Sequence, residues 1–302
     1  MTQRFNETVG QEKGIEVTYE KVPAGWQEYT QKIIAQAAAG TPPDVVNLSP
    51  LNKVDFLNND YLLDLKPLME ADNLEMSQWY PPTFDAWKDE EGHIFGFGHG
   101  IYTEAIFYNK DLFEEAGLEP PPLDWDNSWS WEEFAEYART LTKGEGPDKQ
   151  YGFYVENQLG WMTPIFKSFC GSIGLPDGSR LNMDSEGSVA ALEFITDLMW
   201  KDGTCPHADV TSATPVGDLF QTGRLAMHWD GSWWNPTYAE NVTEFEWGVL
   251  PLPSGSCGTW TGYWVDAFSI PATAAHPQES YEFIKFLVGD EASNAYVDNA
   301  LF

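Results

Sequence analysis

Two long β-prone runs interrupt a regular alternation of strand and helix patterns, and this arrangement constrains the fold more than any other feature. An alternating apolar and polar stretch, Gly14 to Pro23, precedes a helical pattern from Trp26 to Gly40 and a short apolar strand within Pro42 to Pro50. Such alternation predicts an α/β layer with a mostly parallel sheet. The long runs, 101–109 and 262–270, predict strands that connect two such layers.

The rest of the chain continues this pattern. Ser130 with Glu133 three residues later predicts a capping box at the start of a helix. The segment 218–235 predicts a helix, a strand and a turn, and "FEWGVLPLP" predicts a strand that prolines end. At 302 residues the chain exceeds the usual size of one domain, so we expect two.

Acidic residues outnumber basic residues by 47 to 16, which gives a net charge of −31. This balance argues against binding to nucleic acid, which needs clustered Lys and Arg, and against docking on anionic lipid. Because the acids are spread along the whole chain, we interpret them as a solubility coat. No apolar run is long enough to span a membrane, and the polar start "MTQRFNETVG" is not a signal peptide.

Sequence motifs for metals, nucleotides and catalysis are missing. The five histidines are scattered, so we expect neither a metal nor a cofactor. Cys170, Cys205 and Cys257 could supply one disulfide and a free thiol, or three buried apolar fillers. The run "GFGHGI" lacks the spacing of a phosphate-binding loop, and there is no nucleophile elbow or catalytic cysteine signature. We therefore expect no catalytic residues.

Tryptophans concentrate between positions 228 and 264, where six of the 14 in the chain lie. The stretch "HWDGSWWN", His228 to Asn235, sets three indoles among residues that favour turns. A single Trp most often belongs to a core, but this cluster also contains carboxylate and amide side chains. A pyranose lies with its apolar C–H face on an indole, and its hydroxyl groups need polar partners. The cluster therefore favours a carbohydrate site.

A series of segments resembles family 1 extracellular solute-binding proteins, the sugar-binding components of ABC importers related to maltose-binding protein. The specific pieces are "GTPPDVV", "YNKDLFEEAG", "GRLAMHWDGSW" and "AAHPQESYEFIKFL", which match in order and spacing. The resemblance implies a two-lobed α/β periplasmic-binding-protein-like fold (type II) that closes on a sugar between its lobes. Lobe one would comprise residues 1–106 plus 264–302, and lobe two residues 107–263. Compared with the family pattern, we expect the chain to be truncated at both ends.

The resemblance also implies site residues. Trp233 matches the aromatic that stacks on sugar in the family, and Glu104 matches a cleft acid at the first crossing between lobes. Trp161 falls where the family places an aromatic on the second lobe. Asn47 and Ser49 lie at a strand end, where open α/β sheets bind ligands. The residues expected to bind sugar are Trp233, Glu104, Trp161, Asn47, Ser49, Asp230, Asn235, Trp264 and Asp266.

The resemblance implies a non-catalytic receptor that captures a carbohydrate and delivers it to the transmembrane subunits of an ABC permease. We expect a monomer that is exported, either to the periplasm or as a lipid-anchored surface protein, with its leader not present in this chain. One alternative is a glycoside hydrolase that uses a carboxylate pair such as Glu104 and Asp266. A lectin-like adhesin, which would bind sugar without domain closure, is a third hypothesis.

Overall fold

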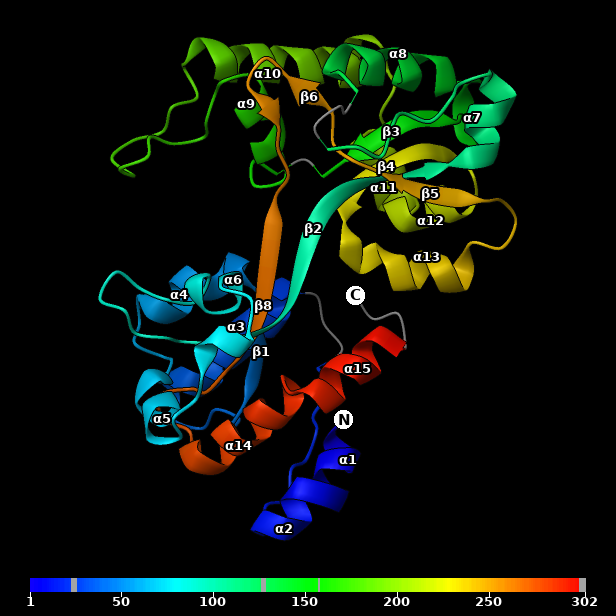
Figure 1. The fold of residues 1–302 in the computed structure, drawn as a ribbon. Coiled ribbons are helices and arrows are strands. Elements are labelled where there is room, and N and C mark those ends of the chain that lie inside the picture. The colour runs from blue at the N-terminus through cyan, green and yellow to red at the C-terminus, as the bar shows by residue number, and fades with distance from the viewer. Residues whose placement is uncertain (23–25, 126–128, 157, 299–302) are drawn as a thin grey trace. The chain divides into compact units, whose positions relative to one another are not determined.

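The chain divides into two units at points within two strands, β2 (Phe97–Asn109) and β8 (Tyr263–Ser269). Unit 1 consists of Met1–Tyr102 and Trp264–Phe302, and unit 2 consists of Thr103–Tyr263. The computed structural model describes residues 1–22, 26–125, 129–156 and 158–298 (Figure 1).

Unit 1 surrounds a small sheet with short helices. Strand β1 pairs with β8 in antiparallel register, with Val46 opposite Ser269 and Leu48 opposite Ala267, and β8 is followed by β2 in the strand order. The elements of unit 1, besides parts of β2 and β8, are α1 (Thr2–Phe5), a π-helical turn (Asn6–Gly10), α2 (Gln11–Lys13), α3 (Trp26–Ala38), β1 (Val46–Leu48), a 3-10 turn (Pro50–Asn52), α4 (Lys53–Leu57), α5 (Lys66–Ala71), a 3-10 turn (Met76–Gln78), α6 (Pro82–Asp85), α14 (Pro277–Leu287) and α15 (Asp290–Asp298).

The strand predicted from Gly14 to Pro23 is wrong within the described residues, which extend to position 22. Gly14 ends α2 with a left-handed φ of 70°, and residues 15–22 form neither strand nor helix. The backbone of Val17 is hydrogen-bonded by the side-chain amide of Asn6 at 2.8 and 2.9 Å. Ile15 and Val17 pack against a cluster that includes Phe283. Ile15 and Val17 of the alternating pattern therefore form a partly buried face, while Tyr19 is exposed, and the backbone of Val17 pairs with a side chain instead of a strand.

Unit 2 is built around β4, which pairs on one side with β2 and on the other with β3. Its elements, besides parts of β2 and β8, are α7 (Lys110–Ala116), α8 (Trp131–Leu141), a 3-10 turn (Gly146–Asp148), β3 (Tyr151–Val155), α9 (Thr163–Ser168), α10 (Glu186–Thr196), a π-helical turn (Asp197–Lys201), α11 (Ala208–Ala213), α12 (Val216–Gln221), β4 (Leu225–Gly231), a 3-10 turn (Ser232–Trp234), α13 (Asn235–Asn241), β5 (Trp247–Leu250), β6 (Ser254–Gly255) and β7 (Gly258–Thr259).

The prediction of a mostly parallel sheet is wrong for the described strand pairs. Strands β3 and β4 run parallel, as a helical crossover through α9 to α12 allows, but β4 and β5 each pair antiparallel with β2. In unit 1, β1 and β8 are also antiparallel. Alternation of strand and helix along a chain predicts the class of layer. It does not determine which strands become neighbours.

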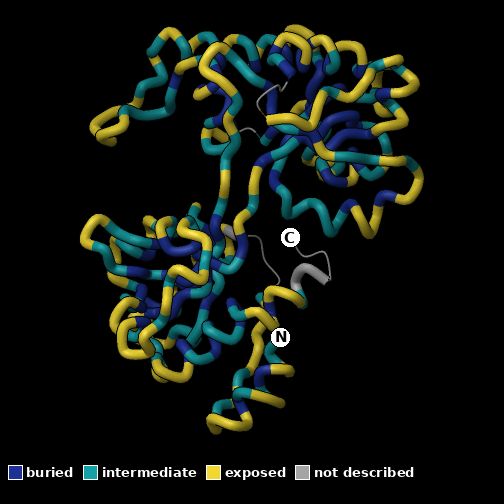
Figure 2. The backbone as a smooth tube through the Cα atoms, in the orientation of Figure 1, coloured by how far each residue is buried: buried dark blue, intermediate teal, exposed yellow. Residues whose placement is uncertain are grey.

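The core of unit 2 lies between its sheet and its helices. All residues of β4 from Leu225 to Trp229 are buried (Figure 2). Phe153 of β3 meets Phe134 of α8 edge to face with ring centroids 5.2 Å apart. The predicted capping box of Ser130 and Glu133 at the start of α8 is confirmed. This core packs around β4 and so positions the Trp-rich turn at its exit.

The cysteines form one disulfide, between Cys170 and Cys257, and Cys205 is a buried free thiol. Of the two arrangements that the sequence allowed, the structure therefore has the disulfide with a free thiol. The bridge joins the residues after α9 to the hairpin of β6 and β7, 87 positions later in the chain.

Candidate functional site

The Trp-rich stretch begins on β4 and continues as a 3-10 turn before α13. Because strand side chains alternate, Trp229 and its neighbour His228 lie on opposite faces of β4. Trp229 is fully buried and packs against Trp131, with ring centroids 5.3 Å apart. The 3-10 turn then presents Trp233 and Trp234, both of which are partly buried. The three indoles of this stretch therefore have different surroundings.

Trp234 packs inward, whereas Trp233 pairs with Trp161. The ring of Trp234 stacks on Tyr238 of α13 with centroids 5.1 Å apart and planes at 16°. Trp233 meets Trp161 edge to face at 6.2 Å and 68°. Since both members of that second pair are partly exposed, they form a corner of apolar surface at the end of β4.

Each of these two turn indoles lies directly on a glycine. A Cβ on Gly231 would come within 2.1 Å of the ring of Trp233, and a Cβ on Gly217 within 2.5 Å of the ring of Trp234. Any other residue at these positions would displace the ring or the backbone, so the glycines are required for the close approach.

Asp230 holds the surrounding indoles by hydrogen bonds. Its Oδ1 accepts from Trp161 Nε1 at 3.2 Å and from the backbone N–H of Gly231 at 2.7 Å. Its Oδ2 accepts from Trp234 Nε1 at 2.8 Å and lies 3.3 Å from His228 Nε2. Burial alone raises the pKa of Asp230, but the donors of His228, Gly231 and Trp234 outweigh burial and leave that pKa below its ordinary value. Asp230 is therefore a charged carboxylate at neutral pH.

His228 continues this network into the core. The ring is 1% exposed, and its Nδ1 lies 2.5 Å from the hydroxyl of Tyr238, which is fully buried. Because Nε2 faces the carboxylate of Asp230, the partners favour a proton on Nε2 and an Nδ1 that accepts from Tyr238.

Glu104 lies on β2 opposite Gly231 and is 4% exposed. Its Oε2 accepts from Trp229 Nε1 at 2.7 Å, while Oε1 has no hydrogen-bond partner among the described residues. Burial, with a smaller contribution from the charge of Asp230, raises the pKa of Glu104 to about 8, although the bond from Trp229 opposes the shift. The carboxyl group is therefore mainly neutral at pH 7 and able to donate as well as accept a hydrogen bond.

A second group of predicted residues lies in unit 1. Ser49 directly follows β1, and its hydroxyl donates to Asp266 of β8. Burial raises the pKa of Asp266 to about 6 against the opposing hydrogen bond from Ser49. Asn47 Oδ1 lies 3.0 Å from His99 Nε2, and Trp264 is partly buried on β8.

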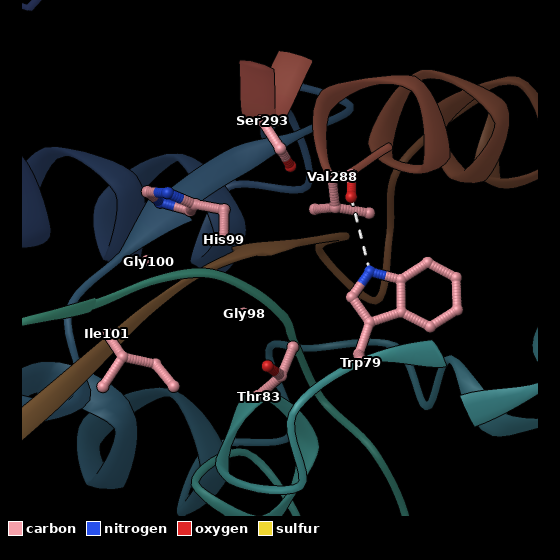
Figure 3. Close-up of a pocket in the computed structure, with 8 residues that line it drawn as sticks. All are labelled: Trp79, Thr83, Gly98, His99, Gly100, Ile101, Val288 and Ser293. Atoms are coloured by element: carbon pink, nitrogen blue, oxygen red, sulfur yellow. Dashed lines mark hydrogen bonds between the residues drawn. The ribbon is translucent and has the colours of Figure 1, made fainter. Parts of the chain in front are cut away.

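A pocket of about 180 Å³ adjoins His99 in unit 1 (Figure 3). Burial lowers the pKa of His99 to about 4, so its imidazole is neutral at pH 7. Trp79 Nε1 donates to the carbonyl of Val288 at 3.3 Å at one wall. The lining residues are Trp79, Thr83, Gly98, His99, Gly100, Ile101, Val288 and Ser293.

The structure thus brings the predicted residues together in two groups. In unit 2 these are Glu104, Trp161, Asp230 and Trp233, with Asn235 at the start of α13. In unit 1, Asn47 and Ser49 lie on and just after β1, where they contact His99 and Asp266, and Trp264 lies on the same strand as Asp266.

Sequence reasoning missed His228 as a partner of Asp230, Tyr238 as the partner of His228, and His99 as the partner of Asn47. The spacing of His228 and Asp230 at i and i+2 on one strand was a usable signal for the first. Asn47 and His99 are 52 positions apart, and no sequence pattern links them.

Two features are absent from the described residues, which are 1–22, 26–125, 129–156 and 158–298. Nowhere in those ranges do three or more His, Cys, Asp or Glu side chains gather as they would to bind a metal ion. In the same part of the chain, every helix is too short or too polar to cross a membrane.

Comparisons with known proteins give a consistent result. A model of the family of bacterial extracellular solute-binding proteins matches residues 1–294. A putative binding protein of Brucella abortus is 24% identical over 295 residues, which cover 96% of this chain and 68% of the relative.

Solved structures share the fold. An ABC substrate-binding protein of Listeria monocytogenes in complex with cycloalternan has a TM-score of 0.89 at 23% identity, covering 99% of this chain and 74% of its own. UgpB of Mycobacterium tuberculosis in complex with glycerophosphocholine has a TM-score of 0.84 at 19% identity, and the match covers 99% of this chain and 75% of UgpB. The predicted two-lobed α/β fold class is confirmed by these similarities.

Proposed function

The chain belongs to the family of bacterial extracellular solute-binding proteins, and from this premise we propose that it is the carbohydrate receptor of an ABC importer. The observation that carries the proposal is the corner formed by Trp161 and Trp233 in unit 2. Two partly exposed indoles meet there edge to face, beside the carboxyl groups of Asp230 and Glu104. A structure similar to this chain holds the carbohydrate cycloalternan.

The chemistry of the corner suits a sugar ring. An indole offers a flat apolar face to the C–H groups of a pyranose, and the ring of Trp233 is the platform we assign to that contact. Hydroxyl groups that lose water on binding need new hydrogen-bond partners. A neutral carboxyl group such as Glu104 supplies both a donor and an acceptor within one side chain.

The charges of the corner favour a neutral ligand over a phosphate. Among the described residues, the basic side chain that reaches either carboxyl group is His228, whose Nε2 lies 3.3 Å from Asp230 Oδ2, and no Lys or Arg pairs with Asp230 or Glu104. A phosphate would meet the negative charge of Asp230 without a Lys or Arg to bind it. The glycerophosphocholine bound by the similar UgpB structure is therefore not the ligand class that we propose here.

Export and delivery belong to the same proposal. Disulfides persist in oxidising compartments, so the bridge between Cys170 and Cys257 supports a place outside the cytoplasm, in the periplasm or at a lipid-anchored cell surface. We further propose that units 1 and 2 are the two lobes of the family fold, and that the protein works as a monomer that hands sugar to permease subunits without catalysis. The family match does not favour the glycoside hydrolase alternative.

The test is a thermal-shift and calorimetric titration of the full chain with maltose, mannotriose, cycloalternan and glycerophosphocholine. A sugar at one hundred times its Kd is expected to stabilise the protein by about 2.7 kcal/mol. Binding of glycerophosphocholine alone would contradict the proposed ligand class. Sustained hydrolysis of aryl glycosides that Glu104→Gln abolishes would end the receptor assignment.

Trp233→Ala is the sharpest variant for this site. It removes the apolar platform, so the loss of sugar affinity is expected to be about 2 kcal/mol, near thirtyfold in Kd. The free energy of unfolding without sugar is expected to fall by less than that, because the ring is partly exposed. Trp200→Ala is the matched control, since that exposed indole lies elsewhere in unit 2, against His207. A Trp233→Ala protein that unfolds readily but binds sugar normally would place Trp233 in the core.

A further inference from the structure

Asp230 already uses all the acceptor positions of its carboxylate within the protein. Two oxygens accept about four hydrogen bonds, and four donors surround them: the indole N–H groups of Trp161 and Trp234, the backbone N–H of Gly231, and His228 Nε2. We propose that Asp230 is a positioning residue that orients Trp161, one of the two indoles of the sugar-binding corner, together with the neighbouring Trp234, and does not itself contact the ligand. This proposal rests on the proposed function, because it takes Trp161 and Trp233 as the binding surface.

The hydrogen bonds of Asp230 join parts of unit 2 that are distant in sequence. Trp161 precedes α9 and lies 69 positions before Asp230, whereas Trp234 belongs to the turn that follows β4. An indole has a single N–H donor, so a hydrogen bond from that atom fixes the direction in which the N–H edge of the ring points. Trp161 then meets the ring of Trp233 edge to face. The carboxylate of Asp230 thereby restrains the Trp161 side of the corner.

His228 and Tyr238 hold Asp230 from the core side. The imidazole of His228 lies between the carboxylate and the hydroxyl of Tyr238, and both rings are buried. With Nδ1 occupied as an acceptor, the Nε2 proton stays directed at Asp230. Tyr238 also stacks on Trp234, so one residue supports the indole both through the hydrogen-bond chain and by direct contact. Two attachments, a hydrogen bond and a stacked ring, thus hold the indole of Trp234.

Direct contact between Asp230 and a sugar hydroxyl is the competing role. To accept a ligand hydroxyl, the carboxylate would have to release one of its four donors. That donor, an indole or backbone N–H next to a buried group, would then lose its partner. The free-energy penalty of such an unsatisfied donor exceeds the net stabilisation from one new hydrogen bond to a ligand. The geometry therefore favours a supporting role over contact.

The first experiment needs no ligand. In the full chain labelled with ¹⁵N at its 14 tryptophans, the indole N–H signals of Trp161 and Trp234 are assigned with Trp161→Phe and Trp234→Phe. Asp230→Asn keeps the size of the side chain but turns one oxygen into a donor that faces a donor. We expect both signals to shift and their hydrogen exchange to speed up on the order of tenfold.

Controls in the same unit make this result specific. The indole N–H of Trp131, which is bonded to Ser168 Oγ, is expected to stay unchanged in Asp230→Asn. Asp184→Asn removes an exposed carboxylate that pairs with Arg180, and it is expected to move none of the three signals. Unchanged signals of Trp161 and Trp234 in Asp230→Asn would overturn the proposal.

If Asp230→Asn does not fold, Tyr238→Phe decides, because it removes only the hydroxyl and keeps the stacked ring. The same two indole signals are expected to shift by a smaller amount. Their constancy in a folded Tyr238→Phe protein would overturn the proposal.

The second experiment separates positioning from contact with a sugar that the wild type binds. If Asp230 is a positioning residue, Asp230→Asn weakens the binding of the parent sugar and of each of its monodeoxy analogues by the same factor, about tenfold in Kd. Its effect on the binding free energy is then also not additive with that of Trp161→Phe. If Asp230 contacts the sugar directly, the loss of affinity caused by Asp230→Asn disappears for the one analogue that lacks the bound hydroxyl, and this result would overturn the proposal. If no sugar binds the wild type, the proposed function fails, while the indole signals still decide the role of Asp230.

Discussion

Asp230 in unit 2 and Asp266 in unit 1 are both aspartates on strands and largely withdrawn from solvent, yet their pKa values move in opposite directions. In both cases the contribution of burial, taken by itself, raises the pKa. At Asp230 several donors outweigh burial and the pKa is lowered, whereas at Asp266 the hydrogen bond from Ser49 does not, and the pKa rises to about 6. The number of donors, more than the depth of burial, thus decides whether a buried carboxyl group is charged.

Glu104 extends the comparison within unit 2. It is buried beside Asp230, but the donor that reaches its carboxyl group is the single indole of Trp229, and its pKa rises to about 8. Two neighbouring acids in one corner therefore differ in charge at pH 7. Asp230 is committed to holding indoles, while Glu104 is neutral.

The largest expected effect is the loss of the Asp230 carboxylate. Asp230→Ala leaves two indole N–H groups, a backbone N–H and His228 without their acceptor, so we expect a loss of about 3–5 kcal/mol in the free energy of unfolding. Asp266→Asn at pH 7 is expected to be neutral or stabilising, because it removes a charge that a single donor compensates. Urea unfolding of both variants measures the contrast. Equal losses would show that donor number does not separate the two sites.

The pH dependence of Asp266 gives the second effect. Its folded pKa of about 6 lies above the ordinary 3.8, so the stability it contributes is fully present below pH 3.8 and is lost as the pH rises through 6. The stability of the wild type relative to Asp266→Asn is therefore expected to fall by about 3 kcal/mol across that window. Urea unfolding of both proteins at pH 4, 5 and 7 measures this fall in relative stability. Because His99 titrates in both proteins, its contribution cancels when the two are compared. A relative stability that increases with pH would reverse the assigned shift.

The titration of Glu104 gives the smallest of the three effects, and it falls in a pH range that is easy to measure. Its folded pKa of about 8 lies above the ordinary 4.5, so its contribution is lost as the pH rises from 4.5 through 8. Between pH 6 and pH 8 the wild type is expected to lose about 2 kcal/mol relative to Glu104→Gln, which resembles the neutral acid in shape. Chemical denaturation at both pH values tests this. Parallel pH profiles of the two proteins would mean that Glu104 is already ionised at pH 6.

Local signals in the sequence predicted local structure well. The strand in Pro42 to Pro50, the helix from Trp26 and the capping box of Ser130 with Glu133 are all confirmed, because each depends on residues near one another in the chain. The strand predicted from Gly14 is wrong because an alternating pattern indicates which side chains face the core, and does not indicate whether a neighbouring strand is there to pair with the backbone.

Long-range partners limited the prediction of the site. Composition indicated that the Trp-rich turn mixes apolar faces with acids, but Trp229, Trp233 and Trp234 have different surroundings that depend on β-strand alternation and on the turn geometry. The bond from Trp161 to Asp230 and that from Trp229 to Glu104 cross 69 and 125 positions. No spacing rule within one sequence connects residues so far apart.

The glycines beneath the corner also bear on how its specificity could be changed in the laboratory. Gly231 and Gly217 lie under the rings of Trp233 and Trp234, and Gly262 lies under the carboxyl group of Glu104, where an added Cβ would come within 2.1 Å of Oε1. A library that randomises the whole corner would mostly yield displaced side chains, since any Cβ at these three positions meets a ring or a carboxyl group. Keeping the glycines constant while varying the side chains above them should retain many more folded variants. A single added methyl group at each glycine would then act as a wedge that tilts one chosen side chain at a time.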